Sequence, residues 1–274
     1  YDYTNEGWKQ YGSDIRGGNN FGENISLSSE GNIIAIGQSS YIRDSNSDSG
    51  WASNEIILTS LGASNRSPVS LSSDGKIWAI TTSKGVGVFQ KNDLTNGWDQ
   101  IGDFIESDFY TYGYSSFGES ISLDSEGKIL AIGAPEEGAG MVRVYEFKNN
   151  NWNLAKAWGN MVGLASRFGA SVSLSNDGEI LSVGASSIGY YPYTGVGYVS
   201  TYKNDGGKWT PYGEIIRGQS GDWFSEATRI SGDGTTLGVG AERNSTASGN
   251  SGNVTLYKFS TTISDTDSVK TYSG

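Results

Sequence analysis

Apolar and polar residues alternate in short stretches along the whole chain. The clearest stretch, FGESISLDSEGKILAIGAP, runs from Phe117 to Pro135; ISL is apolar at every second position and ILAI is almost wholly apolar. Alternation with a period of two predicts a half-buried strand, and a short apolar run predicts a strand that is buried on both faces. Between them, Glu126-Gly127 predicts a hairpin turn, because glycine accepts the positive φ that such turns require.

The same pattern recurs in four further copies, which makes the chain a repeat protein. The copies are about 50 residues apart, a period typical of propellers and other arrays, and they begin at Phe21, Asn65, Phe117, Phe168 and Phe224. A tryptophan after a turn precedes each of these copies and is taken as the start of the repeat unit; these tryptophans are Trp8, Trp51, Trp98, Trp152 and Trp209. A further strand, such as MVRVYEF at 141–147, completes each unit, and no stretch shows a sustained helical period.

Four strands per repeat predict an all-β fold, a five-bladed β-propeller of four-stranded antiparallel blades. We expect residues 1–259 to form this single domain and residues 260–274 to be a Ser/Thr-rich tail or linker. The strand at 8–12 is expected to pair with the strand at 253–259 in the C-terminal blade, which closes the ring and removes open edges. Trp78, in a buried strand, is interpreted as a core residue. Tyr1-Asp2-Tyr3 resembles the end of a third strand, and together with the tail it indicates a piece of a longer polypeptide or extensions that contact a neighbour.

Composition narrows the function. The 274 residues carry a net charge of −11, which argues against nucleic acid as a partner, because phosphates need a basic surface. Cysteine and histidine are absent from the sequence, which excludes Ser-His and Cys-His catalysis and removes the main ligands of zinc, haem and iron–sulfur sites. No apolar run approaches the ~18 residues of a membrane helix, so we expect no membrane insertion. The low charged fraction of 18% is typical of secreted β-proteins and favours an extracellular location or a cell or virion surface.

The repeat resembles a known family. Phe117-Gly118 before the first strand of the copy and Gly133-Ala134-Pro135 after the second are similar to the FG-GAP repeats of β-propellers, best known from integrin α-subunits. The match covers about residues 7–259 and is most similar to repeats of secreted or surface proteins of marine bacteria, algae and their viruses. One copy alone retains GAP, the second lacks FG, and none has the DxDxDGxxD calcium loop. The resemblance implies extracellular binding or assembly.

Candidate ligand-binding residues gather in two sets. In a meander blade, the loops that enter the first strand share a rim with those that join the second and third strands, and this rim is the most aromatic surface of the chain. Aromatic rings with polar tips suit sugar faces or a protein partner, and these residues are Tyr110, Tyr112, Tyr114, Tyr190, Tyr191, Tyr193 and Trp223. The second set follows the FG position in three copies, near the expected channel mouth, and comprises Glu23, Glu119 and Glu226. Those carboxylates could bind a cation, act on a glycoside, or simply be solvated.

A calcium site is the one cofactor that the sequence suggests. Asp44, Asn46, Asp48 and Glu55 have the spacing of oxygen ligands in an EF-hand loop, although Ser49 replaces its glycine and no helix flanks it. A solvated loop explains the same residues. Of four glycosylation sequons, at Asn24, Asn65, Asn244 and Asn253, those at Asn65 and Asn244 are the better candidates, because the other two lie in or beside predicted strands.

Our leading hypothesis is therefore a non-enzymatic binding or assembly module that recognises a glycan or a surface protein, copies of itself, or other domains of a longer chain. The alternatives are a structural subunit of a surface filament, appendage or virion, and a glycoside-active enzyme that uses the channel carboxylates.

Overall fold

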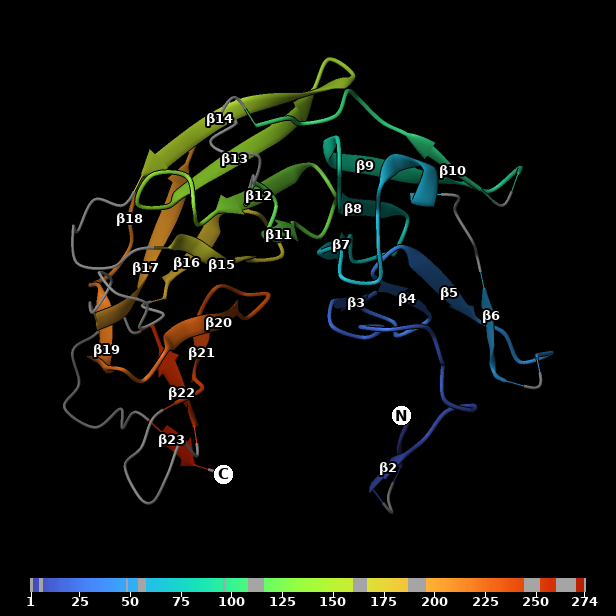
Figure 1. The fold of residues 1–274 in the computed structure, drawn as a ribbon, viewed down its shortest axis with the longest axis horizontal. Coiled ribbons are helices and arrows are strands. Elements are labelled where there is room, and N and C mark those ends of the chain that lie inside the picture. The colour runs from blue at the N-terminus through green and yellow to red at the C-terminus, as the bar shows by residue number, and fades with distance from the viewer. Residues whose placement is uncertain are drawn as a thin grey trace.

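The chain forms an all-β, five-bladed β-propeller in which each blade contains a four-stranded antiparallel sheet (Figure 1). This computed structural model describes residues 2–4, 7–47, 49–53, 58–95, 97–107, 116–159, 167–186, 196–243, 252–259 and 270–273. Apart from one short 3-10 helix, η1 (Leu58–Leu61), the regular elements in these residues are strands. The predicted fold class is thus confirmed.

The first two blades follow a hairpin that stands apart from them. That hairpin consists of β1 (Asp2–Thr4) and β2 (Gly7–Lys9). Blade 1 consists of β3 (Ile25–Leu27), β4 (Ile33–Ile36), β5 (Ser39–Arg43) and β6 (Trp51–Ser53). Blade 2 consists of β7 (Val69–Leu71), β8 (Ile77–Thr82), β9 (Gly85–Asn92) and β10 (Gly97–Gln100).

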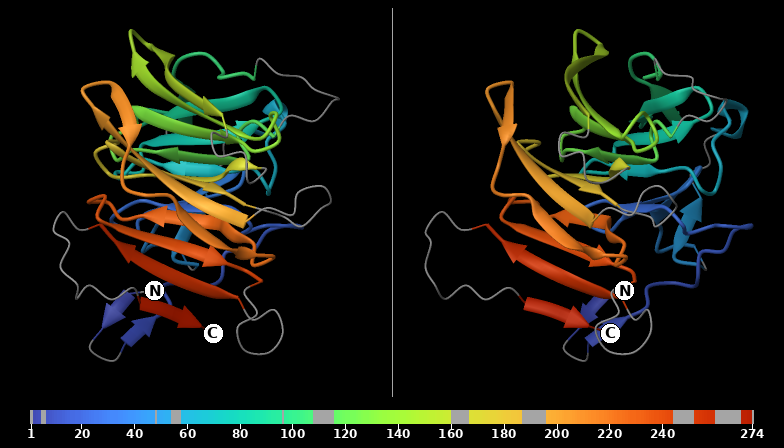
Figure 2. Two further views of the ribbon diagram at one scale, coloured as in Figure 1. Left: turned by 90° about the vertical axis from the view of Figure 1, so that its left-hand side faces the viewer. Right: turned by 60° about the vertical axis from the view of Figure 1, so that its left-hand side comes forward.

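The remaining blades have longer strands. Blade 3 consists of β11 (Ser120–Leu123), β12 (Ile129–Ala134), β13 (Met141–Lys148) and β14 (Asn151–Gly159). Blade 4 consists of β15 (Phe168–Leu174), β16 (Ile180–Ala185), β17 (Val196–Asp205) and β18 (Lys208–Pro211), and β19 (Ile216–Ser220) also pairs with β17. Blade 5 consists of β20 (Phe224–Ile230), β21 (Thr236–Ala241), β22 (Asn253–Lys258) and β23 (Lys270–Ser273). Figure 2 shows the sheets from the side, following one another through the molecule.

The core lies between successive blades. Val86 and Val88 of β9 are fully buried in one cluster with Ile121 and Leu123 of β11, so a face of blade 2 packs on the first strand of blade 3. Small residues of the second strands, Ala35, Ala79, Ala131 and Ser182, are likewise fully buried. Trp78 is also fully buried in the core, as predicted.

The predicted acidic–glycine turns connect the first and second strands of each blade. In blade 2, Gly75 has φ 70°, and Asp74 Oδ1 accepts hydrogen bonds from the Lys76 amide at 2.9 Å and from Ser72 Oγ at 2.7 Å. Successive turns are also joined to each other by backbone hydrogen bonds of 2.8–2.9 Å, from the amides of Ser29, Ser73, Ser125 and Asn176 to the carbonyls of Ser73, Ser125, Asn176 and Gly232. One line of hydrogen bonds therefore runs through all five blades.

The arc of blades has an open side between blades 5 and 1. Extensive strand contacts join β3 to β7, β7 to β11, β11 to β15 and β15 to β20, but no comparable contact joins β20 to β3 among the described strands. Ile25 and Leu27 of β3 are accordingly 55% and 57% exposed, and Val254 and Leu256 of β22 are 49% and 39% exposed. Figure 1 shows both chain ends on this open side.

The predicted closing pair, the strand at 8–12 with the strand at 253–259, does not form in this structure. Instead β2 pairs with β1, with Tyr3 opposite Trp8, and β22 pairs with β23, which comes from the stretch expected to be a tail. Both observed pairs join strands that are near each other in the sequence, whereas the predicted pair would join opposite ends of the chain. The nearer partner is favoured, because the entropic cost of closing a loop rises with loop length.

Candidate binding rim

One rim of the propeller gathers side chains from three blades. Because the strands of each blade are antiparallel neighbours, the loops entering the first strand and the loops joining the second to the third strand lie on the same rim, as predicted. We call this the loop rim. The first of its tyrosine-rich stretches lies within residues 108–115, before β11, and the second within residues 187–195, between β16 and β17.

Arg167 is the centre of the charged groups on the loop rim. It lies immediately before β15, and its guanidinium contacts Glu119 of blade 3 through Nη2 and Glu136 through Nη1, the latter at 2.9 Å. Burial raises the pKa of Glu119 above its ordinary value; Arg167 opposes this shift, while the charges of Glu136 and Glu226 add to it. Two carboxylates therefore share one cation, with a third nearby.

A buried ion pair lies beside this group. Arg143 Nη2 is 2.8 Å from Glu137 Oε2, and the two side chains are 7% and 5% exposed. Ser107 Oγ donates a hydrogen bond of 2.6 Å to Glu137 Oε1. The pair joins Glu137, in the loop after β12, to Arg143 of β13. Removing either member would leave the other as an uncompensated buried charge.

The fifth blade contributes the aromatic part of the loop rim. The Arg243 guanidinium lies 3.5 Å from the centroid of the Trp223 ring, and the Arg243 amide donates to the Asp222 carbonyl at 3.0 Å. A cation over an aromatic face is attracted by the electrons of the ring. Glu226, three residues after Trp223, accepts a hydrogen bond of 2.7 Å from Ser186 Oγ of blade 4.

The structure thus brings together some of the predicted residues and separates another. Glu119 and Glu226 interact electrostatically, whereas Glu23 pairs with Arg66 of blade 2 at 3.0 Å, in a separate ion pair. Tyr110, Tyr112, Tyr114, Tyr190, Tyr191 and Tyr193 lie outside the described residues. Ser107, Ser116 and Ser186, which flank the two stretches, are described. Ser107 contacts the Glu137 carboxylate, the Glu136 amide donates to Ser116 Oγ at 2.8 Å, and Ser186 contacts the Glu226 carboxylate.

Two of the four predicted calcium ligands, Asp44 and Asn46, are described. Asp44 Oδ1 accepts a hydrogen bond of 2.8 Å from the Asn46 amide, a local turn that needs no metal. Asp48 and Glu55 lie outside the described residues. Within the described ranges, no group of three or more acidic residues has an arrangement suited to a metal ion. Calcium binding by this loop stays a prediction.

Of the two candidate glycosylation sites, Asn65 lies in the described part of the chain. Asn65 is half-buried, and its side-chain amide donates a hydrogen bond of 3.2 Å to the Asn19 carbonyl. Asn244 lies outside the described residues.

The sequence did not point to the arginines and serines that organise the loop rim. Each of these arginines contacts a residue that lies between 6 and 48 positions away in the sequence, and no local motif marks them. They are Arg66, Arg143, Arg167 and Arg243. Arg66 and Arg167 lie at or next to the FG position of the repeat and Arg243 lies in a loop of the same rim, whereas Arg143 lies within β13 and has no such signal.

Comparisons with known proteins show the fold. Neither a protein-family model nor a curated protein matches the sequence. Among solved structures, hydrazine synthase from Kuenenia stuttgartiensis is similar with a TM-score of 0.55 and 13% identity, over 97% of this chain and 69% of that one. A putative 6-phosphogluconolactonase from Bacteroides uniformis has a TM-score of 0.54 and 11% identity, over 91% and 70%. The GH74 enzyme of Niastella koreensis has a TM-score of 0.54 and 16% identity, over 96% and 38%.

Identities this low are evidence of a shared β-propeller fold and not of a shared activity. In the residues that the structure describes, no helix is both long enough and apolar enough to span a membrane.

Proposed function

We propose that the protein is a non-enzymatic binding or assembly module of the extracellular space or of a cell or virion surface, and that it recognises a glycan or a protein through the loop rim. The observation that carries this proposal is that residues flanking both tyrosine-rich stretches are hydrogen-bonded to glutamates of the loop rim. Ser107 and Ser116, which flank one stretch, bond to the Glu137 carboxylate and the Glu136 backbone amide, and Ser186, which flanks the other, bonds to the Glu226 carboxylate.

The chemistry of the rim supports binding. Tyrosine and tryptophan rings provide contact area with little loss of conformational freedom, and they dominate the energetics of many interfaces. Trp223, with Arg243 over its ring, provides such a ring three residues before Glu226. The paired arginines and carboxylates supply polar groups at the same rim. The resemblance to FG-GAP repeats points to the same class of function.

The experiment is a glycan array and a screen of surface-protein ligands with the wild type and three variants. We expect a triple Tyr110/Tyr112/Tyr114→Ser variant and a Trp223→Ala variant each to weaken binding at least about tenfold, as for interface aromatic residues in general. Leu94→Ser is the control, because Leu94 is 98% exposed in the loop between β9 and β10, on the opposite rim. Equal binding by all variants would reject the loop rim as the site.

A second candidate function, glycoside hydrolysis, rests on the raised pKa of Glu119 near Glu226, since such enzymes use two carboxyl groups in different protonation states. Turnover of a sugar that is lost in Glu119→Gln and in Glu226→Gln would favour the enzyme. Glycan binding without turnover, retained in a Glu23/Glu119/Glu226→Gln triple variant, would favour the binding module.

A further inference from the structure

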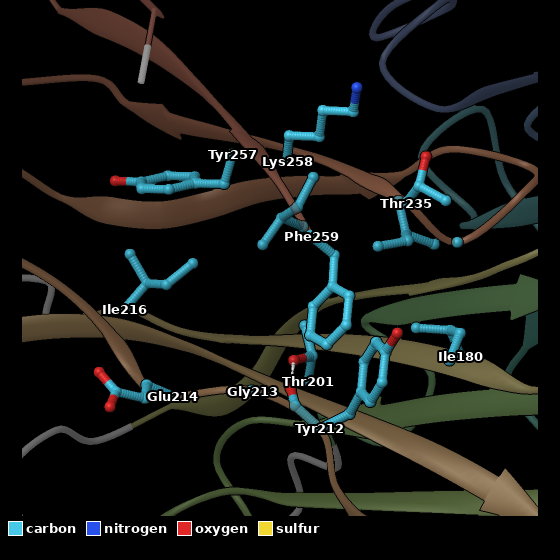
Figure 3. Close-up of a pocket in the computed structure, with 13 residues that line it drawn as sticks. Ile180, Thr201, Tyr212, Gly213, Glu214, Ile216, Thr235, Tyr257, Lys258 and Phe259 are labelled. Atoms are coloured by element: carbon cyan, nitrogen blue, oxygen red, sulfur yellow. Dashed lines mark hydrogen bonds between the residues drawn. The ribbon is translucent and has the colours of Figure 1, made fainter. Parts of the chain in front are cut away.

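A pocket of about 200 Å3 lies between blades 4 and 5, away from the loop rim (Figure 3). We call it the blade 4–5 pocket. Its walls are mainly apolar and include Ile180, Tyr212, Leu237, Tyr257 and Phe259. Tyr212 and Phe259 are stacked, with ring centroids 3.9 Å apart and an interplanar angle of 19°.

The corresponding place between blades 2 and 3 is filled by a tryptophan. Trp152 of β14 is 8% exposed and lies in one cluster with Leu130, Tyr145 and Phe147. Its ring centroid is 5.2 Å from that of Phe147, and its Nε1 donates to the Ile101 carbonyl at 3.2 Å. Trp152 stands opposite Phe147 across the sheet.

Repeat positions relate the two places residue by residue. Leu237 stands opposite Tyr257 in blade 5 as Leu130 stands opposite Tyr145 in blade 3, and Phe259 follows two residues later, as Phe147 does. Tyr212 lies three residues after Trp209, as Ile101 lies three after Trp98. The blade 4–5 pocket therefore has the walls of a tryptophan site.

The fifth blade supplies no such tryptophan, because none follows Trp223 in the sequence. The stacked Tyr212 and Phe259 rings narrow the site without filling it, and the remaining walls suit a flat aromatic ring.

Trp8 occupies a strand position like that of Trp152. It lies on β2, where it stands opposite Tyr3, as Trp152 stands opposite Phe147, and its side chain is 71% exposed. The segment after it is attached to blade 1: the Tyr11 ring contacts the Trp51 ring at 6.0 Å, and the Ser13 amide donates to the Ser49 carbonyl at 2.9 Å.

We propose that the blade 4–5 pocket binds the indole ring of Trp8 from a second copy of this chain. A second copy is the occupant because the segment that follows β2 is held to blade 1 at Tyr11 and Ser13, and Figure 1 shows blade 1 across the open side from β22. Trp8 and the pocket are different surfaces, so the contact is head to tail, and it produces rings or open filaments when it repeats. This goes beyond binding at the loop rim, which faces another side of the blades.

Charge sets the conditions of this association. Each copy carries a net charge of −11, so copies repel one another at low salt. A contact made by an apolar ring in an apolar pocket should therefore strengthen as salt is raised, whereas one made by opposite charges would weaken.

The experiment is sedimentation velocity on the whole chain over a range of concentrations. We expect the wild type to associate, and Trp8→Ala and Tyr212→Ala each to raise the dissociation constant at least about tenfold, as expected for a buried aromatic anchor. Free indole should compete. Leu94→Ala, which removes another exposed apolar side chain, is the control and should associate like the wild type.

Mixing the two variants gives the sharpest result. Trp8→Ala retains the pocket and Tyr212→Ala retains Trp8, so the mixture should form dimers that grow no further, while each variant alone stays monomeric. A wild type that is monomeric throughout, or variants that associate as the wild type does, would overturn the proposal. So would a monomer in which Trp8 is protected from quencher, because that result would place Trp8 within its own chain.

Discussion

At the scale of the residue, the FG position illustrates how a local sequence signal arises. The glycine of this motif has a positive φ in three blades, 90° at Gly22, 82° at Gly118 and 92° at Gly169, a conformation that side chains disfavour. In blade 5 the same position is Ser225, with φ 73°. Its side chain is fully buried, and its hydroxyl has no hydrogen-bond partner in the part of the chain that the structure describes.

We predict that Ser225→Gly raises the free energy of unfolding by about 1 kcal/mol, because it relieves the backbone conformation and removes an unpaired buried hydroxyl. Urea unfolding measures the change. The reverse substitution, Gly169→Ser, should destabilise the fold by more, since a Cβ there would lie 2.6 Å from the Met141 carbonyl oxygen. If Ser225→Gly destabilises the fold, the hydroxyl has a role that its surroundings do not show.

At the scale of the element, the first strand of each blade is joined to the next by a serine. The hydroxyl oxygens accept hydrogen bonds of 2.9–3.1 Å from the first-strand amides of Leu71, Leu123, Leu174 and Ile230, and they belong to Ser26, Ser70, Ser122 and Ser173. These are the polar positions of the ISL and VSL alternation. The sequence therefore predicted the strands and their apolar positions, but the polar positions looked like solvent-facing residues, and only the packed blades reveal their role.

Ser122→Ala is expected to cost about 1–3 kcal/mol of unfolding free energy, because it leaves the buried Leu174 amide without its acceptor. Ser26→Ala is the matched control: it removes the same kind of bond from a half-buried serine, and water can replace the lost hydroxyl there. Thermal and urea unfolding of both variants gives the comparison, and an equal cost for the two would contradict the explanation from burial.

At the scale of the whole molecule, the two end blades differ from the inner ones. Leu27 of blade 1 is 57% exposed, but its counterpart Leu71 of blade 2 is 7% exposed, although both belong to an SLS sequence. The difference comes from the neighbour, because blade 1 covers the first strand of blade 2 while the open side leaves the first strand of blade 1 uncovered.

We therefore predict that Leu71→Ala lowers the free energy of unfolding by about 2–5 kcal/mol, as is typical of buried leucines, while Leu27→Ala lowers it by less than about 1 kcal/mol. The two variants delete the same atoms from the same repeat position, so chemical denaturation at low protein concentration compares burial alone. Similar losses would mean that blade 1 is covered in solution.

The sequence by itself determined the repeat, the number of blades, the turns and most of the strands, though not β23, since alternation and acidic–glycine pairs act over a few neighbouring residues. Of the candidate rim, it indicated Glu119, Glu226 and Trp223 but not the arginines that pair with them. Only the tertiary structure decided which blades meet, because the same local sequence is buried at Leu71 and exposed at Leu27. It likewise paired β22 with β23 and formed the apolar pocket between blades 4 and 5. Those outcomes depend on contacts between residues far apart in the chain, which no short pattern encodes.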